Sequence, residues 1–228
     1  MEGGRVCRAI FFDVDGVVVH PGSRVSRSHQ PWFSALQSDL ALDFAALSGR
    51  LFSPGLEAMS PMELCSLGRS DIADVLGPIL KDLRYRGTVG DFLQYWFEHD
   101  AYVDGALLRI VEILRARYGY RCYLATNQEH RRASFLWDVL GLKERFDGMY
   151  YSARLGYSKK SPEFYQVVEA DFAFVETPIY FDDHEPFVQI ALEAGWDACL
   201  YGSVDSLREH PRLRWLDRHY ATEGICSP

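Results

Sequence analysis

The sequence lacks several features that would place it in large classes of proteins. No apolar run among its 228 residues approaches the length that spans a membrane, and there is no internal repeat or low-complexity tract. The apolar run near the start is brief and contains two aspartates, so it does not predict a signal peptide. Lysine and arginine form no dense stripe, and the formal net charge of -8 argues against a nucleic-acid binder. We therefore expect a soluble cytoplasmic protein without a membrane or nucleic-acid partner.

Cysteine is also scarce. The five cysteines include no Cys-x-x-Cys pair and leave an odd count, a pattern that fits reduced thiols with a structural role. Apolar residues, by contrast, are plentiful, because hydrophobic residues make up 48% of the chain and aromatic residues 14%. A chain of this length and composition can bury a substantial core, either as one large domain or as a core with a smaller insertion.

Apolar periodicity divides the chain into two parts. Between residues 28 and 100 apolar residues recur at helical spacing, which predicts an all-helical insertion after the first strand and a loop at 18–27. Beyond residue 103 helices and strands alternate, which predicts an α/β fold with a parallel sheet covered by helices on both faces. The expected helices span 106–118, 129–140, 162–170 and 187–194, with a helical tail through 216, and the expected strands span 121–125, 149–151, 178–181 and 198–201.

The strongest functional signal is the segment Ala-Ile-Phe-Phe-Asp-Val-Asp-Gly-Val at residues 9–17. Its apolar residues predict a buried parallel strand that ends at Asp13, and Gly16 lets the chain turn sharply beyond it. Asp13 and Asp15 are thereby placed at the edge where open α/β sheets bind ligands. Two carboxylates so close together repel each other unless a cation or a shared proton compensates them. The pair therefore indicates metal-assisted chemistry.

Two later segments supply groups suited to an anion. Thr126 and Asn127 follow the second strand and offer a hydroxyl and backbone N–H groups before a helix; the alternative is that Thr126 only caps this helix. Lys159 and Lys160 precede another helix, for which Ser161 is the expected N-cap. Since positive charge gains nothing from the helix dipole at this end, one of the two lysines is expected to serve an anion or to balance carboxylates.

A second acidic pair, Asp182 and Asp183, ends a further apolar strand. Adjacent residues on a strand point to opposite sides, so one of the two can ligate a metal while its neighbour organises the surroundings. Magnesium is the natural cation, because carboxylates, carbonyls and water are its preferred ligands and it commonly shares phosphate oxygens with a substrate. The alternative is that the pair lies in a solvated loop.

Together these segments resemble the four motifs of the haloacid dehalogenase superfamily, in the order and structural contexts of that family. They are Asp-x-Asp-Gly-Val, Ala-Thr-Asn, Gly-Tyr-Ser-Lys-Lys-Ser-Pro-Glu-Phe-Tyr and Phe-Asp-Asp-His-Glu-Pro. The resemblance implies a Rossmann-like core domain at residues 1–19 and 101–228 and a helical cap of the C1 type at residues 20–100. It also aligns Lys159 with the lysine of the family, and Lys160 then replaces a proline. The chain looks most like the branch that contains small sugar-phosphate phosphatases.

The resemblance implies a magnesium-dependent, two-step phosphoryl transfer from a small phosphorylated metabolite. Asp13 is the implied nucleophile and forms an aspartyl-phosphate, while Asp15 protonates the leaving oxygen and then activates water. The implied Mg²⁺ ligands are the carboxylates of Asp13 and Asp182 and the backbone carbonyl of Asp15, and Asp183 is expected to hold a water on the metal. The implied groups that bind the phosphate and stabilise its charge are Thr126, the Asn127 backbone and Lys159.

Three alternatives stay open from the residues alone. A phosphotransferase or phosphomutase of the same superfamily also uses both aspartates of the first motif. A metal-dependent nucleotide-sugar glycosyltransferase explains an Asp-x-Asp after a strand, but it gives the later motifs no role. A non-catalytic binding protein with the same fold is the third. Dehalogenases and phosphonatases lack an acid at the position of Asp15, which weakens those interpretations.

Overall fold

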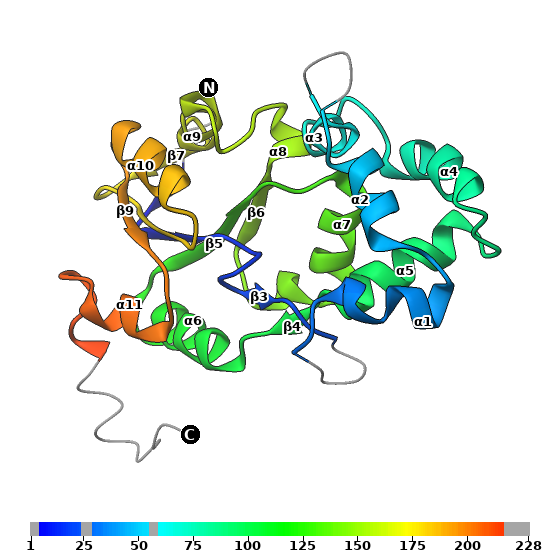
Figure 1. The fold of residues 1–228 in the computed structure, drawn as a ribbon. Helices are drawn as coiled ribbons and strands as arrows, with labels where there is room; N and C mark the ends of the chain where they lie inside the picture. The colour runs from blue at the N-terminus through cyan, green and yellow to red at the C-terminus, as the bar shows by residue number, and fades with distance from the viewer. Residues whose placement is uncertain (1–4, 24–28, 55–58, 217–228) are drawn as a thin grey trace.

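A five-stranded parallel sheet forms the centre of the part of the molecule that lies outside the helical insertion (Figure 1). The structure, a computed structural model, describes residues 5–23, 29–54 and 59–216. The strand order is β6-β5-β2-β8-β9, and each neighbouring pair is parallel. The strands are β2 (Ala9–Phe12), β5 (Arg121–Thr126), β6 (Gly148–Tyr151), β8 (Ile179–Asp182) and β9 (Asp197–Leu200). The predicted α/β fold with a parallel sheet is confirmed.

Helices cover both faces of this sheet because its central strand is apolar on both sides. Ile10 and Phe12 of β2 belong to one buried cluster, and Phe11 between them belongs to another, as expected when side chains alternate across a strand. The first cluster includes residues of α6 (Gly105–Tyr118), α7 (His130–Ser134) and α11 (Val204–Glu209). The second includes residues of α9 (Pro162–Glu169) and α10 (Glu185–Glu193).

Some of the predicted helix boundaries are confirmed and others are wrong. Gly119 ends α6 with a φ of 64°, as its position after the last apolar residue suggested. The π-helical turn η2 (Phe135–Val139) continues α7, followed by the short helices η3 (Leu142–Glu144) and α8 (Ser152–Leu155). The predicted helical tail through 216 is confirmed only for α11, which ends at Glu209, and residues 211–215 form turns. His210 is extended, with a ψ of 127°, since it precedes Pro211 and a proline disfavours helical backbone before it.

The helical insertion has a hydrophobic core of its own. Trp32 and Trp96 stack at 4.8 Å between ring centroids, and Leu47, Leu76 and Phe92 are buried around them. The helices of the insertion are η1 (Trp32–Ala35), α1 (Leu36–Leu40), α2 (Phe44–Leu51), α3 (Pro61–Ser66), α4 (Ile72–Asp82) and α5 (Val89–His99). In Figure 1 these helices lie to the right of the sheet. None of the helices in the described ranges has the length and apolar character needed to cross a membrane.

Two short strand pairs were not predicted. β3 (Val19–His20) pairs antiparallel with β4 (Tyr102–Val103), where residues 18–27 were expected to form only a loop. β1 (Arg5–Cys7) pairs with β7 (Phe172–Phe174). Strands of two or three residues are too short to show an alternating pattern in the sequence. The β3–β4 pair matters for the site, because it joins the chain entering the insertion to the chain leaving it.

The cysteines of the described residues form no disulfide, which agrees with their expected structural role. Burial raises the pKa of Cys65 to about 12 and also raises the pKa of Cys122. Both groups are therefore thiols rather than nucleophilic thiolates near neutral pH. Cys226 lies outside the described residues.

One partly buried acid, Asp147, ties helix α6 to the start of β5 and β6. Asp147 accepts hydrogen bonds from the backbone N–H of Cys122 at 2.9 Å, from Arg115 Nε at 3.0 Å and from Arg121 Nη1 at 2.8 Å. Burial by itself would raise the pKa of Asp147, but these donors outweigh it and hold the pKa below its usual value. The ionised form is thus favoured by folding.

We expect Asp147→Asn to lower the free energy of unfolding by about 1–3 kcal/mol at pH 7, because the donors lose a charged acceptor. Since the folded-state pKa is depressed, the contribution is complete above the ordinary value near 4 and is lost as the pH falls through the lower folded value. Urea unfolding at several pH values should therefore show a gap between wild type and variant that narrows below about pH 4. Asp138→Asn is the control, because its ion pair with Lys143 is exposed. Equal stability of the two variants at pH 7 would contradict the prediction.

Candidate active site

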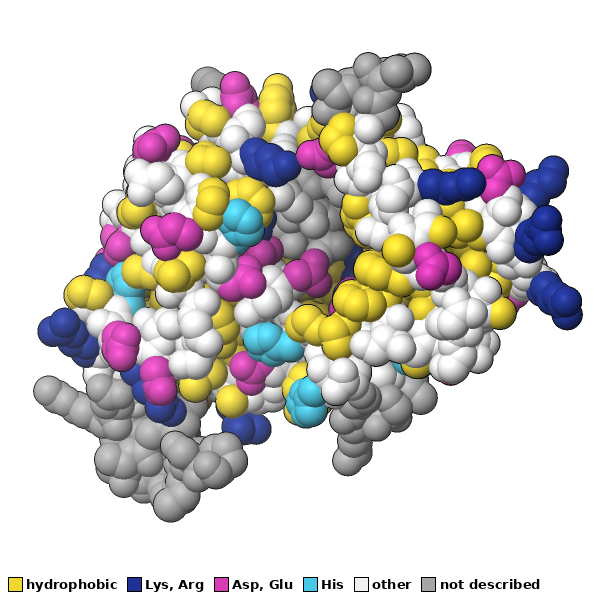
Figure 2. Space-filling model, viewed as in Figure 1, with side chains coloured by type: hydrophobic (Ala, Val, Ile, Leu, Met, Phe, Trp, Pro, Cys, Tyr) yellow, Lys and Arg dark blue, Asp and Glu magenta, His cyan; other side chains and the backbone are white. Residues whose placement is uncertain are grey.

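Three strands deliver polar side chains to one edge of the sheet. Asp13 follows β2, while Thr126 and Asp182 are the last residues of β5 and β8, the two neighbours of β2. A cavity of about 470 Å³ opens at this edge, and Figure 2 shows the surface hollowed there, between the sheet and the helical insertion, with acidic side chains at the rim. The predicted residues that line the cavity are Asp13, Asp15, Thr126, Asn127, Lys159 and Asp183. Asp182 lies beneath them and is fully buried.

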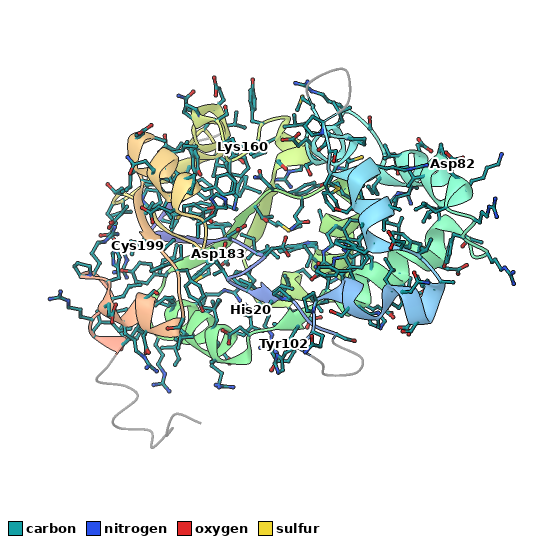
Figure 3. The ribbon with its side chains drawn as sticks, in the orientation of Figure 1. His20, Asp82, Tyr102, Lys160, Asp183 and Cys199 are labelled. Carbon is teal, nitrogen blue, oxygen red and sulfur yellow. The ribbon has the colours of Figure 1, made fainter. Side chains whose placement is uncertain are left out.

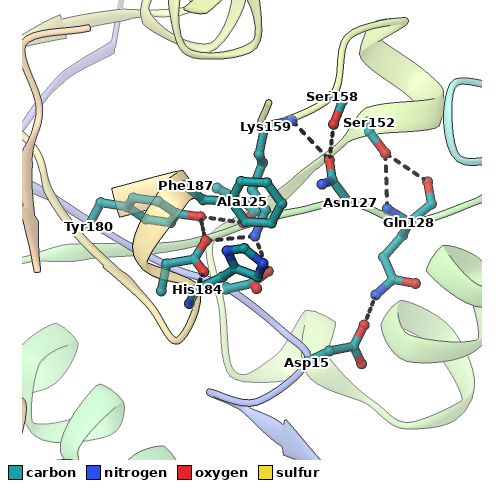
Figure 4. Close-up of polar contacts among 12 residues, drawn as sticks. Asp15, Ala125, Asn127, Gln128, Ser152, Ser158, Lys159, Tyr180, His184 and Phe187 are labelled. Carbon is teal, nitrogen blue, oxygen red and sulfur yellow. Dashed lines mark hydrogen bonds and ion pairs between the residues drawn. The ribbon is translucent and has the colours of Figure 1, made fainter. Parts of the chain in front are cut away.

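A buried lysine sits between two carboxylates at the base of the cavity. Lys159 Nζ lies 2.7 Å from Asp13 Oδ1 and 2.7 Å from Asp182 Oδ2, and its side chain is 1% exposed (Figure 4). Burial would lower the pKa of Lys159, but the two carboxylates outweigh it and raise the pKa above its usual value. For Asp13, burial and the charge of Asp182 raise the pKa to about 7 although Lys159 opposes the shift. The lysine is therefore charged, and burial favours the protonated form of Asp13 even with this cation beside it.

Neighbouring groups fix this arrangement. Asn127 Oδ1 accepts hydrogen bonds from the backbone N–H of Lys159 at 2.9 Å and from Ser158 Oγ at 3.3 Å, which anchors the loop that carries the lysine. The Asp182 carboxylate accepts from the Tyr180 hydroxyl and, at 2.8 Å, from the backbone N–H of His184. Each of these bonds reduces the freedom of a charged group, so the site is held in one geometry before any ligand arrives.

The donor set fits a hard divalent cation. Asp13, Asp182 and Asp183 each offer a carboxylate oxygen, and these oxygens lie within 4.8 Å of one another. Asp13 Oδ1 is buried and, among the described residues, receives no hydrogen bond of good geometry, although it forms the ion pair with Lys159. An oxygen left in this state has capacity for a further positive partner, and an all-oxygen set suits Mg²⁺.

Gly16 is required by this cluster. Its φ of 82° lies in the left-handed region, and a Cβ at this position would come within 2.0 Å of Asp183 Oδ2. The sharp turn predicted at Gly16, beyond the first strand, is thus confirmed. The close approach of Asp183 gives a second reason why only glycine fits.

Asp15 has a different environment from Asp13. Its side chain is 56% exposed and turns away from the three clustered carboxylates toward Gln128, whose Nε2 donates to Asp15 Oδ2 at 2.5 Å. Arg132 Nη2 lies 3.8 Å from the other oxygen, Asp15 Oδ1. The side chain of Asp15 is therefore separate from the cluster formed by Asp13, Asp182 and Asp183.

Sequence reasoning missed Gln128, Arg132 and Tyr180. A signal for Tyr180 was present, because it shares a strand face with Asp182 two residues later, whereas Gln128 precedes helix α7 and shares no helical face with Arg132. The capping alternative for Thr126 is wrong, since the next helix has Glu129 as its N-cap. The capping role expected of Ser161 also fails in part: Ser161 occupies the N-cap position, but its hydroxyl donates to the Glu163 carboxylate and makes no cap hydrogen bond.

The two lysines of the third motif have different surroundings. Lys160 is 64% exposed, pairs with Glu63 of α3 at 3.1 Å and lies well away from Asp183 (Figure 3). Lys159 alone reaches the cavity. The expectation that one lysine balances carboxylates is thus met by Lys159.

Comparison with known proteins agrees with this geometry. A family model described as haloacid dehalogenase-like hydrolase matches residues 7–195. A HAD family enzyme of Bacteroides thetaiotaomicron in a magnesium complex superposes with a TM-score of 0.65 at 16% identity, over 86% of this chain and 95% of that one. A predicted HAD-like family hydrolase of Porphyromonas gingivalis gives 0.64 at 16% identity, over 95% and 97%.

A 2-haloacid dehalogenase of Pseudomonas syringae gives a TM-score of 0.55 at 18% identity, over 95% of this chain and 99% of that one. No curated protein matches the sequence. At these identities the likeness to solved structures establishes the fold, which has a Rossmann-like core, and leaves the chemistry to the residues of the site.

Lys159→Met should lower the free energy of unfolding by about 3–5 kcal/mol in the presence of a chelator, because two buried carboxylates lose the cation between them. Added Mg²⁺ should restore part of this loss and raise the melting temperature of the variant more than that of wild type. Lys160→Met is the matched control, with an expected change within about 1 kcal/mol, since its ion pair is exposed. Thermal unfolding of all three proteins with and without Mg²⁺ measures both effects. Similar losses in the two variants would show that the buried ion pairs of Lys159 do not stabilise the fold.

Proposed function

The chain belongs to the haloacid dehalogenase-like hydrolases, whose family model spans residues 7–195, and we propose that it is a magnesium-dependent phosphatase acting on a small phosphate monoester. The observation that carries the proposal is the pairing of two acids of opposite character. Asp13 is buried against Lys159, while Asp15 is exposed and held apart by Gln128. Membership in a hydrolase family leaves the glycosyltransferase alternative without support.

The two acids divide the proposed reaction between them. An oxygen of Asp13 attacks phosphorus, so a new P–O bond forms as the bond to the leaving oxygen breaks, and Asp15 gives that oxygen its proton. Asp15, now ionised, takes a proton from the water that attacks the aspartyl-phosphate, which releases phosphate and restores both carboxyl groups. A second acid at position 15 is what distinguishes this chemistry from that of dehalogenases of the same superfamily.

The remaining groups stabilise charge in the transition state. Lys159, the Thr126 hydroxyl and the Asn127 backbone N–H line the cavity around Asp13 and are proposed to contact the phosphoryl oxygens. Mg²⁺ would be held by the carboxylates of Asp13 and Asp182 and the carbonyl of Asp15, with Asp183 beside it. It would supply positive charge to the phosphoryl oxygens and favour the ionised form of Asp13.

We further propose that residues 20–100 act as a cap over a core formed by residues 1–19 and 101–228. The cavity is lined from both sides of this division, by Asp13 and Lys159 in the core and by His20 and Asp100 at the base of the insertion. The insertion has its own hydrophobic core, so it is able to move as a unit. Polar contacts such as the ion pair of Arg131 Nε with Asp71 Oδ1, at 2.8 Å, connect the two parts.

The test is a phosphatase screen with Mg²⁺ over p-nitrophenyl phosphate, sugar phosphates, nucleotides and phosphorylated acids. Wild type should release inorganic phosphate from at least one of them, and a chelator should abolish the release. Asp13→Asn should lose about 10³-fold or more in kcat, because the nucleophile is absent, and Asp15→Asn about 10²- to 10⁴-fold. Asp138→Asn, exposed and remote from the cavity, serves as the control.

The proposal fails if wild type hydrolyses no phosphate monoester, or if Asp13→Asn retains its activity. Accumulation of an isomerised sugar phosphate in place of free phosphate would identify a phosphomutase.

A further inference from the structure

We propose that Gln128 and Arg132 are positioning residues that hold the Asp15 carboxylate and tie its placement to the end of helix α5 in the insertion. This inference rests on the proposed function, in which Asp15 is the acid and base. It adds two residues outside the four sequence motifs and a physical link between the insertion and the acid–base group.

The two oxygens of Asp15 face two different partners. Gln128 Nε2 donates to Oδ2 at 2.5 Å, and Arg132 Nη2 lies 3.8 Å from Oδ1 (Figure 4 shows the first contact). Asp15 itself is more than half exposed, whereas Gln128 and Arg132 are both buried. The carboxylate is therefore an exposed group set against two buried ones, and we infer that these two contacts determine its direction.

Gln128 is fixed through its backbone. Its N–H donates to Ser152 Oγ at 3.0 Å, and its carbonyl accepts from Ser152 Oγ at 3.3 Å and from the N–H of Ala153 at 3.2 Å. Both partners begin helix α8, in the core. The Gln128 amide thus approaches Asp15 from a part of the protein that does not depend on the insertion.

Arg132 is fixed by the insertion. Its Nη1 donates to the carbonyl of Phe97 at 3.0 Å and its Nη2 donates to the carbonyl of Asp100, while its guanidinium lies 5.4 Å from the Phe97 ring centroid and 5.6 Å from that of Phe135. Phe97 and Asp100 belong to the last turn and the C-cap of α5, where helical carbonyls lack partners within the helix. The same Nη2 that bonds to Asp100 faces Asp15.

A single guanidinium group therefore contacts the end of the insertion and the acid of the first motif. A shift of α5 relative to the core displaces Arg132, or breaks its bonds to the α5 carbonyls, and either event changes the charge that Asp15 Oδ1 faces. Arginine suits this task because its planar fork presents several donors in fixed directions, which lysine does not. Position 132 is thus predicted to need the geometry of arginine as well as its charge.

Substrates whose leaving groups differ in basicity distinguish a positioning role from a purely structural one. A purely structural defect would lower kcat/KM for both kinds of substrate alike. kcat/KM reports the steps through phosphoryl transfer to Asp13. An alkyl leaving group needs the proton from Asp15 in that step, whereas p-nitrophenolate leaves without one. Misplacement of Asp15 should therefore reduce kcat/KM for an alkyl phosphate far more than for p-nitrophenyl phosphate.

The experiment compares Gln128→Leu, Arg132→Lys and Arg132→Met with Arg131→Met. Arg131 is the matched control, because it also joins the core to the insertion, through Asp71, but it does not contact Asp15. The substrates are p-nitrophenyl phosphate and the sugar phosphate that wild type hydrolyses best. The ratio of kcat/KM, alkyl over aryl, should fall about 10- to 100-fold in the three variants and change less than about twofold in the control, as a loss of part of the acid catalysis predicts.

A second measurement covers the other role of Asp15. Slower activation of water should let the aspartyl-phosphate accumulate, so the variants should show a burst of p-nitrophenol before the steady state. Equal losses for both substrates without a burst, or no loss at all, would overturn the inference while leaving the phosphatase proposal intact. If wild type hydrolyses no phosphate monoester in the screen, the phosphatase proposal itself is wrong and this inference falls with it. If Arg132→Met does not fold, Arg132→Lys, which keeps the charge, tests the link to α5, and Gln128→Leu tests the contact from the core.

Discussion

The buried contact between Lys159, Asp13 and Asp182 is the constraint on which the rest of the structure depends. Two carboxylates at the ends of adjacent strands repel each other in a site that water hardly reaches, and the lysine between them, 2.7 Å from each, offsets that repulsion. A third acid, Asp183, leaves the total charge of the cluster negative. The cluster therefore has capacity for a further cation, which is what the proposed phosphoryl transfer requires of it.

The parallel sheet supplies this contact by register. Because Phe12 pairs with Phe181 and Leu124 on the two neighbouring strands, all three strands end at the same edge of the sheet. Large apolar residues on both faces prevent a slip of the register, since a shift by one residue would turn Phe11 and Phe12 to the wrong clusters. The packing of apolar side chains in the interior of the sheet therefore determines where the charged side chains at its edge lie.

The same logic explains what the sequence could and could not reveal. Buried strands and the polar residues at their ends are local patterns in the sequence. Asp13, Thr126 and Asp182 could therefore be assigned to one edge of the sheet from the sequence. The β3–β4 pair joins Val19 to Val103 across the whole insertion, and pairs of two residues show no pattern in either segment. The end of α11 differs from the prediction because Pro211 disfavours helical backbone at His210, and this local effect outweighs the apolar periodicity beyond it.

Residues that act through another residue are the hardest to find from one sequence. Gln128 and Arg132 look like ordinary helix-start residues, and only the fold shows that one is anchored on α8 and the other on α5. This separation has a consequence for the two acids of the first motif. Asp13 is held by the core through Lys159, so its placement does not depend on the insertion, whereas Asp15 lies between a contact from the core and a contact that follows the insertion. In the proposed mechanism the nucleophile is thus held by the core alone, and the acid is the group whose placement a movement of the insertion would change. If α5 takes its present position only when the insertion closes over a substrate, the proposed proton transfer from Asp15 is confined to that closed state.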